Sequence, residues 1–105
     1  MEISNEHNGF QLKLLHKLTS KSDDNIDIEV TLAGGERFTA TFTTLRNIAT
    51  MMEKYRESGE CLAGKYFWAS ELIVVDELKV DLIRDVVSDL LKSGELFRAF
   101  GGPHD

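Results

Sequence analysis

The sequence predicts an α+β domain in two layers, with a four-stranded, mostly antiparallel sheet and two helices on one of its faces. Three patterns lead to this prediction. Residues 26–43 alternate apolar and polar side chains around two glycines, residues 45–55 and 78–91 place apolar side chains at helical spacing, and residues 64–76 combine three aromatic residues with an aliphatic run. The expected order of elements is therefore β-β-β-α-β-α.

The first strand is predicted over residues 10–18, where apolar residues occupy most of the even positions. Strand side chains alternate between the two faces of a sheet, and Leu15 is the one violation of that alternation. A helix is the competing interpretation, because four apolar residues of this stretch would share one helical face. Leu12 falls outside that face, which favours the strand. A polar connector of turn-forming residues follows over 19–25.

A β-hairpin is predicted around Gly34 and Gly35, because apolar residues occupy the even positions on both sides of them. Cross-strand partners share a face of the sheet, so the loop between the strands must contain an odd number of residues. The simplest such loop runs from Gly34 to Glu36, with a glycine at positive φ. The expected pairs are then Leu32 with Phe38, Val30 with Ala40, and Ile28 with Phe42.

The first helix is predicted from Leu45 onward, with Thr43 or Thr44 capping its first-turn amides. Its apolar residues recur at the spacing of one helical face, and they are Leu45, Ile48, Ala49, Met52 and Tyr55. Gly59 is expected to end the helix in the left-handed conformation. The helix is long enough to serve as a crossover, so the strand that follows can run parallel to a hairpin strand.

A further strand is predicted over residues 64–76, because aromatic and β-branched residues favour a pleated surface. Alternation directs Tyr66 and Trp68 to one face and Phe67 to the other. Both faces are apolar, so the strand is either covered on both sides or shows an aromatic patch. The flanking helices must cover something, which favours the core. If one face stays open, Tyr66 and Trp68 are the expected anchors for a partner.

The second helix is predicted to start after Asp76 as N-cap and to stop at Gly94, with one more turn packed on the core. Four carboxylates recur every four residues on the side opposite its apolar stripe, namely Glu77, Asp81, Asp85 and Asp89. A solvated helix surface is the ordinary interpretation of this pattern. A docking surface for a basic protein is the functional one. Residues 101–105 are expected to fray.

The composition excludes several classes of function. A chain of 105 residues suits a single domain, 1–105, with an ordered core expected over about 9–100. The formal net charge of −6 repels nucleic-acid phosphates and anionic membranes. The N-terminus lacks the cationic and apolar regions of a signal peptide, and no apolar run approaches the roughly 20 residues that span a bilayer. We therefore expect a cytoplasmic protein with no nucleic-acid and no membrane partner.

Catalysis needs two or three convergent groups, and no such set can be assembled from this sequence. His7 and His104 lie near opposite ends of the chain, and His16 is expected to be a structural imidazole at the end of a strand. Cys61 follows Glu60, whose charge disfavours a reactive thiolate. No second ligand stands at metal-binding spacing from any of these residues. We therefore expect no metal, no cofactor and no enzymatic activity.

The stretch from Gly59 to Ser70, which reads GECLAGKYFWAS, and the following LIVV at 72–75 resemble a pattern in small uncharacterised bacterial proteins. Together with the threonine-rich hairpin and the two helices, the resemblance covers about residues 26–100. It implies a compact bacterial protein of a kind often encoded beside secreted or contact-delivered toxins. It assigns no activity and no site residue.

These observations together predict a protein-binding module, most concretely an immunity or antitoxin-like inhibitor that covers a basic toxin or nuclease. The expected contact residues are Glu77, Asp81, Asp85 and Asp89, with Tyr66 and Trp68 as aromatic anchors. The alternative is a housekeeping interaction domain that associates with itself, as a homodimer joined at an open sheet face or at a strand edge.

Overall fold

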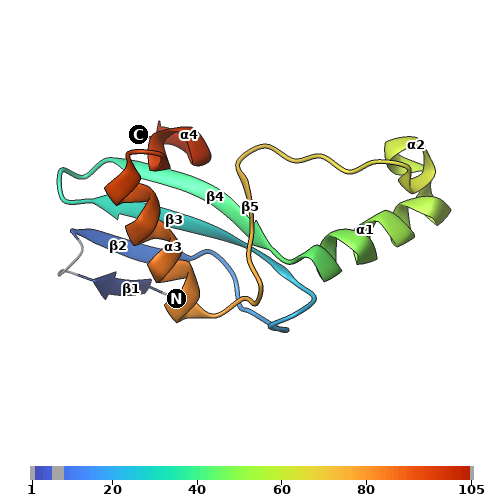
Figure 1. Cartoon of the computed structure of the whole chain (residues 1–105), viewed down its shortest axis with the longest axis horizontal. Coiled ribbons are helices and arrows are strands. Elements are labelled where there is room, and N and C mark those ends of the chain that lie inside the picture. Colours follow the sequence, from blue (N-terminus) through green and yellow to red (C-terminus); the bar gives the residue numbers. More distant parts are fainter. Residues whose placement is uncertain (1, 6–8, 105) are drawn as a thin grey trace.

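The computed structural model describes residues 2–5 and 9–104, so His7 lies outside the described residues. The elements follow one another as β1 (Glu2–Asn5), β2 (Phe10–Leu14), β3 (Asn25–Leu32), β4 (Arg37–Thr43), α1 (Leu45–Ser58), α2 (Glu60–Gly64), β5 (Leu72–Val74), α3 (Val80–Ser93), α4 (Leu96–Ala99) and β6 (Gly101–His104). Figure 1 shows α3 and α4 at the sheet, and α1 and α2 extending away from one end of it.

The described strands form one sheet in the order β1-β2-β3-β4-β5, and β6 also pairs with β4. All pairs are antiparallel except β4 with β5, which are parallel as predicted for a strand that follows a helical connection. β5 pairs with residues 41–43 of β4, whereas β6 pairs with its first half, at Arg37 and Thr39. The α+β class is thereby confirmed, and β1 and β6 add two strands to the four expected.

The strand interpretation of residues 10–18 is confirmed for β2, in which buried and exposed residues alternate. The strand ends at Leu14. The next residue, Leu15, is exposed, and its amide donates to the Asp27 carbonyl oxygen at 3.0 Å. Leu15 thus violates the alternation only because the prediction carried the strand too far.

The β3–β4 hairpin confirms the predicted faces but not the predicted register. Its pairs are shifted by two residues, so that Ile28 lies opposite Ala40. The loop spans residues 33–35, one residue earlier than expected, and Gly35 is the residue at positive φ (93°). The Gly35 amide donates to the Leu32 carbonyl oxygen at 2.9 Å. A turn closed in this way and followed by a left-handed glycine is a favoured three-residue loop, which decides the register.

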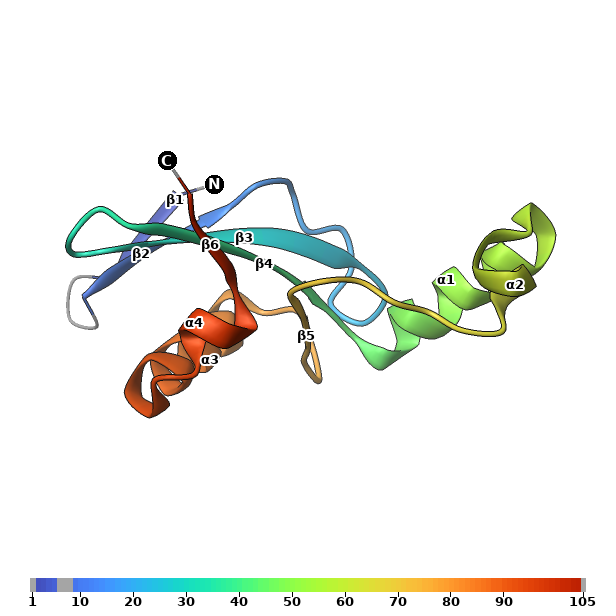
Figure 2. The same ribbon diagram turned by 90° about the horizontal axis from the view of Figure 1, so that it is seen from above.

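The apolar core lies between the sheet face formed by even-numbered residues and the helices α3 and α4, which Figure 2 shows on one side of the sheet. The fully buried side chains include Leu12, Ile26, Ile28, Val30, Phe42, Leu78, Ile83, Val87 and Leu96. Phe42 meets Phe100 edge to face, with the ring centroids 6.1 Å apart. The apolar stripe of α3 therefore covers the sheet as predicted, and α4 supplies the expected extra turn.

Residues 101–104 do not fray as expected, because β6 pairs antiparallel with β4 and brings His104 opposite Arg37, whereas Asp105 lies outside the described residues. Gly102 has a φ of 134°, and a Cβ there would lie 2.8 Å from the Arg37 carbonyl oxygen. A glycine is needed for this close approach. Short segments that contain glycine and proline have low strand propensity, so the pattern of the sequence does not reveal this strand.

Helix α1 does not lie on the sheet as expected. Only Thr44 separates β4 from α1, so the chain has no room to turn back over the sheet, and α1 and α2 extend beyond its end (Figures 1 and 2). The molecule measures 45 × 24 × 23 Å, and Asn47 is the one residue of α1 that is buried. We call residues 45–70 the arm and the rest of the chain the body.

Candidate partner-binding surfaces

Helix α1 begins and ends where the sequence predicts. Thr44 is the N-cap, because its Oγ1 accepts from the Asn47 amide at 3.1 Å, and Gly59 ends the helix at a φ of 87°. The apolar stripe of α1, however, is not covered by the body. Leu45 is 73% exposed and Ala49 is also exposed. The other residues of the stripe, Ile48, Met52 and Tyr55, are partly buried, so the open part of the stripe lies at Leu45 and Ala49.

At the tip of the arm, α2 turns the chain back through an unusual backbone conformation (Figure 1). Cys61, Leu62 and Ala63 all have φ between 51° and 57°, in the left-handed helical region. This region costs L residues roughly 1–2 kcal/mol each. Backbone strain of this kind concentrates at functional sites. The turn leaves Leu62 70% exposed at the tip.

Gly64 attaches the returning chain to α1. It is buried at a φ of 80°, and a Cβ on it would collide with the Met52 carbonyl oxygen and lie 3.0 Å from Cγ of Arg56. The close contact therefore requires a glycine. The rings of Tyr55 and Phe67 then stack at a centroid distance of 6.5 Å and an interplanar angle of 14°, which holds the chain along α1.

The predicted strand over residues 64–76 is wrong for its aromatic half, because β5 contains only Leu72–Val74. Since α1 leads the chain away from the sheet, residues 65–70 must bring it back (Figure 1). Contact with β4 begins at Glu71, whose carbonyl oxygen accepts from the Thr41 amide at 2.9 Å. Trp68 is 71% exposed and Tyr66 is 47% exposed, so placing these two rings in the core was wrong. Phe67 is the member of the aromatic group that packs within the chain.

Polar side chains join the N-terminal turns of α1, residues 45–50, to the loop before β3. We call these turns the foot of the arm. Asn47, which is 7% exposed, donates through Nδ2 to Asp23 Oδ1 at 3.0 Å. Its Oδ1 accepts from Asn25 Nδ2 and Thr43 Oγ1, both at 3.1 Å. The Thr50 hydroxyl donates to the other Asp23 oxygen at 2.9 Å. The hydrogen bonds from Asn47 and Thr50 lower the pKa of Asp23 below its ordinary value of 3.8.

The neighbouring carboxylate, Asp24, closes the same loop from its other side. Its Oδ2 accepts from the amide and the hydroxyl of Thr19, both at 2.9 Å. Burial by itself raises the pKa of Asp24, but these hydrogen bonds outweigh it, and the pKa is lower than 3.8. The arm is thus oriented by a hydrogen-bonded foot at a place that the apolar core does not reach.

Three of the four predicted carboxylates share the solvent side of α3. Asp81, Asp85 and Asp89 are exposed, and they follow one another at four-residue spacing along the helix. Asp81 forms an ion pair with Arg84, with 3.4 Å between Oδ1 and Nη1. The stripe is therefore accessible to a cationic molecule, and one of its charges is already partly compensated.

Glu77 does not belong to this stripe. Helix α3 begins at Val80, with Lys79 as N-cap, and the predicted cap at Asp76 is wrong. Leu78 is 1% exposed, and inserting it into the core keeps the preceding residues out of the helix. Glu77 instead forms an ion pair with Lys79 at 3.2 Å.

The predicted partner residues therefore fall on two separate surfaces. Tyr66 and Trp68 belong to the arm, whereas the aspartates of α3 belong to the body. Both views show α3 alongside the sheet and the arm extending beyond the sheet's end (Figures 1 and 2).

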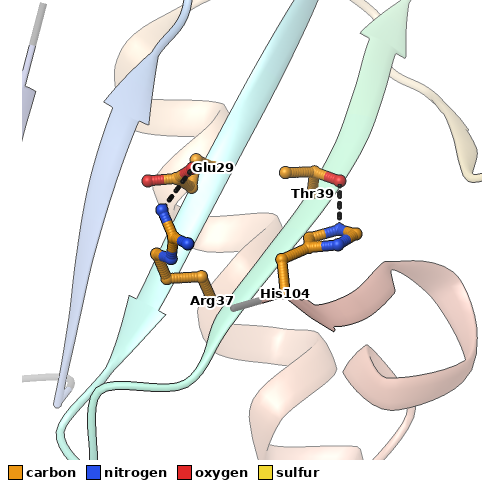
Figure 3. A network of polar contacts seen from close by, with 4 residues as sticks. All are labelled: Glu29, Arg37, Thr39 and His104. Carbon is orange, nitrogen blue, oxygen red and sulfur yellow. Dashed lines mark hydrogen bonds and ion pairs between the residues drawn. The ribbon is translucent and has the colours of Figure 1, made fainter.

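The sheet face opposite the core is polar, and its side chains pair across strands. Figure 3 shows Arg37 beside Glu29, at 3.9 Å, and the Thr39 hydroxyl hydrogen-bonded to the His104 ring at 2.9 Å. Contacts of this kind stabilise neighbouring strands. These two pairs therefore connect β3, β4 and β6 on the solvent side of the sheet.

The remaining titratable candidates lie on different elements. His16 follows β2, and its Nε2 accepts from the Asp27 amide at 3.2 Å. Cys61 is a free, partly buried thiol in α2. Within residues 2–5 and 9–104, no three His, Cys, Asp or Glu side chains form a possible metal site. The helices in this part of the chain are all too short or too polar to cross a membrane.

Three features of the arm were not anticipated, namely the roles of Asn47 and Gly64 and the exposure of Leu62. The role of Gly64 could have been found from the sequence, because two glycines, Gly59 and Gly64, flank the short segment where the chain leaves α1 and turns back. Asn47 stands three residues after the cap at Thr44, so the sequence predicts that its backbone amide donates to the cap. The sequence does not predict the partners of the Asn47 side chain. The exposure of Leu62 depends on where α1 lies, which no local pattern contains.

Comparison of the chain with protein-family models, with curated proteins and with solved structures found no match. The resemblance to small bacterial proteins therefore stays a prediction.

Proposed function

We propose that this chain is a protein-binding module without catalytic activity, and that the arm is its contact surface. The observation that most directly supports this is the exposure of four large apolar side chains on a projection from the body, namely Leu45, Leu62, Tyr66 and Trp68. Apolar residues scattered singly over a surface are ordinary, but their concentration on one projection is typical of an interaction site.

The side chains of the arm suit the centre of a protein interface. Trp and Tyr supply a large contact area at a small loss of conformational freedom, and they are enriched among the residues that dominate binding. Trp68 and Tyr66 lie two residues apart on the returning segment, and Leu62 lies on the turn that precedes it. A partner that covers them also covers the left-handed turn of α2, and its binding offsets the strain stored there.

Affinity purification with the tagged full-length chain, from cells that naturally produce it, tests this proposal. The variants are a Trp68→Ser, Leu62→Ser double substitution in the arm and, as matched control, Leu15→Ser, which changes an exposed leucine of the body. A partner recovered with the wild type and the control, but at least about tenfold less with the arm variant, supports the proposal. Equal recovery with all three proteins overturns it.

The acidic body supports a second candidate function, an immunity or antitoxin-like inhibitor of a basic toxin or nuclease. Asp81, Asp85 and Asp89 are exposed on one side of α3, and acidic patches accelerate association with cationic partners. Reversing all three to lysine raises the formal net charge from −6 to 0. Association with a cationic partner should then become slower and less dependent on salt. An unchanged rate and salt dependence would exclude this surface.

A further inference from the structure

We infer that the arm is covered by a second copy of this chain, with the two arms packed side by side about a two-fold axis. The pairing rests on the proposed role of the arm as a contact surface and names its partner. Closed two-fold symmetry is the commonest arrangement of soluble homo-oligomers, and it requires a surface that is complementary to itself.

The charge of the arm fits another arm better than it fits a basic protein. The arm, residues 45–70, carries four cationic side chains, Arg46, Lys54, Arg56 and Lys65, and three anionic ones, Glu53, Glu57 and Glu60. With four positive and three negative charges its formal charge is +1, and the acidic excess of the chain lies in the body. A basic partner is attracted to the acidic body. Two apolar arms of low, mixed charge meet with little like-charge repulsion.

The arm also has the size of one half of a stable interface. Standard interfaces use roughly 20–30 residues and bury about 800 Å² on each partner. The arm, residues 45–70, contains 26 residues. Homodimer interfaces are more apolar than other protein interfaces, and the arm exposes Leu45 at its base, Leu62 on the turn of α2 and Trp68 on the returning segment.

The shape of the molecule lets the arms meet while the acidic bodies stay apart. The arm extends along the longest dimension, which is 45 Å against 24 and 23 Å for the other two (Figure 2). Antiparallel arms place the two bodies at opposite ends of the pair, so salt screens much of their repulsion, with a Debye length of about 8 Å at physiological ionic strength. The same arrangement brings the positive end of each α1 towards the negative end of the other.

Sedimentation velocity of the full-length protein, from about 1 to 200 µM, tests the pairing. The wild type and Leu15→Ser should sediment with twice the chain mass of 11.8 kDa. A buried aromatic anchor contributes about 30-fold to a dissociation constant, and each pair contains two, so Trp68→Ser with Leu62→Ser should weaken the dimer by about 1000-fold. Ala49→Glu is the second variant, since it places a carboxylate on the open stripe of α1 in a residue type that favours helix. It should also yield monomer, with an unchanged far-ultraviolet circular dichroism spectrum.

Salt dependence and the earlier purification distinguish the possible failures. A dimer held by apolar contacts between the arms should keep its affinity between about 50 and 500 mM NaCl, whereas a dimer held by ion pairs loses affinity. A monomer at every concentration, or a dimer that survives both arm variants, overturns the pairing. If the chain is monomeric but still recovers a different protein through Trp68 and Leu62, only the pairing fails. If the arm variant changes neither result, the protein-binding proposal fails with it.

Discussion

Replacing Asn47 with alanine tests whether hydrogen bonds, rather than apolar packing, hold the arm to the body. The side chain of Asn47 makes three hydrogen bonds at 3.0–3.1 Å, to Asp23, Asn25 and Thr43. Each of the two neutral bonds, to Asn25 and Thr43, contributes about 1 kcal/mol. Water can replace the bond to the solvent-accessible carboxylate of Asp23, so that bond adds no separate amount. We therefore expect a loss of about 2 kcal/mol in the stability of the contact between the N-terminal turns of α1 and the body.

The loss should be local, because no apolar residue of α1 belongs to the buried core. Native-state hydrogen exchange should show the opening free energy of the α1 amides falling by about 2 kcal/mol, while that of β3 and β4 changes by less than about 0.5 kcal/mol. The measurement is made in the Ala49→Glu background, so that arm pairing does not contribute. Arg46→Ala, at an exposed neighbouring position, should change neither by more than that. An equal loss in α1 and the sheet would show that arm and body open as one unit. An unchanged α1 would show that this network does not hold the arm.

Three further outcomes follow from individual contacts. The pKa values of Asp23 and Asp24 are below 3.8 in the folded protein, so their contribution to stability is complete above that value and is lost as the pH falls through the lower folded values. Exchange protection of α1 should therefore fall as the pH drops below 3.8, and it should fall less in Asp23→Asn. Gly64→Ala should release the returning segment from α1 and abolish the Tyr55–Phe67 stack, visible as lost near-ultraviolet circular dichroism, while the core keeps its urea midpoint. Leu96→Ala, in contrast, should lower the free energy of unfolding of the whole body by about 2–5 kcal/mol in urea titrations, because Leu96 is fully buried.

Features that depend on local chemistry were predictable from the sequence. Thr44 and Gly59 bound α1 as expected, because a cap is set by a few adjacent groups. The alternation of β3 and β4 likewise identified the buried face of the hairpin correctly. Alternation did not fix the register of the hairpin, because a three-residue loop at 33–35 and one at 34–36 both keep apolar residues on one face. The left-handed conformation of Gly35 selects the loop at 33–35.

Features that depend on the path of the chain were not predictable. Tyr66 and Trp68 have the composition of a strand, but a strand also needs a neighbour to pair with. Because α1 carries the chain away from the sheet, pairing with β4 resumes only at Leu72. The acidic stripe shows the same limit, since the spacing from Glu77 to Asp89 is helical while the burial of Leu78 delays the start of α3.

An amphipathic stripe shows that a helix needs cover, but not which molecule supplies it. α1 and α3 both carry such a stripe, yet Ile83 and Val87 of α3 are fully buried while Leu45 of α1 is exposed. The difference arises in the connections. Residues 75–79 give α3 room to cross the sheet, whereas the single residue Thr44 before α1 directs that helix outward. The returning segment covers part of the α1 stripe through the stack of Phe67 on Tyr55, while Leu45 and Ala49 stay exposed. Under the proposed pairing a second arm covers them, because the low charge of the arm does not attract the cationic partner that suits the acidic body.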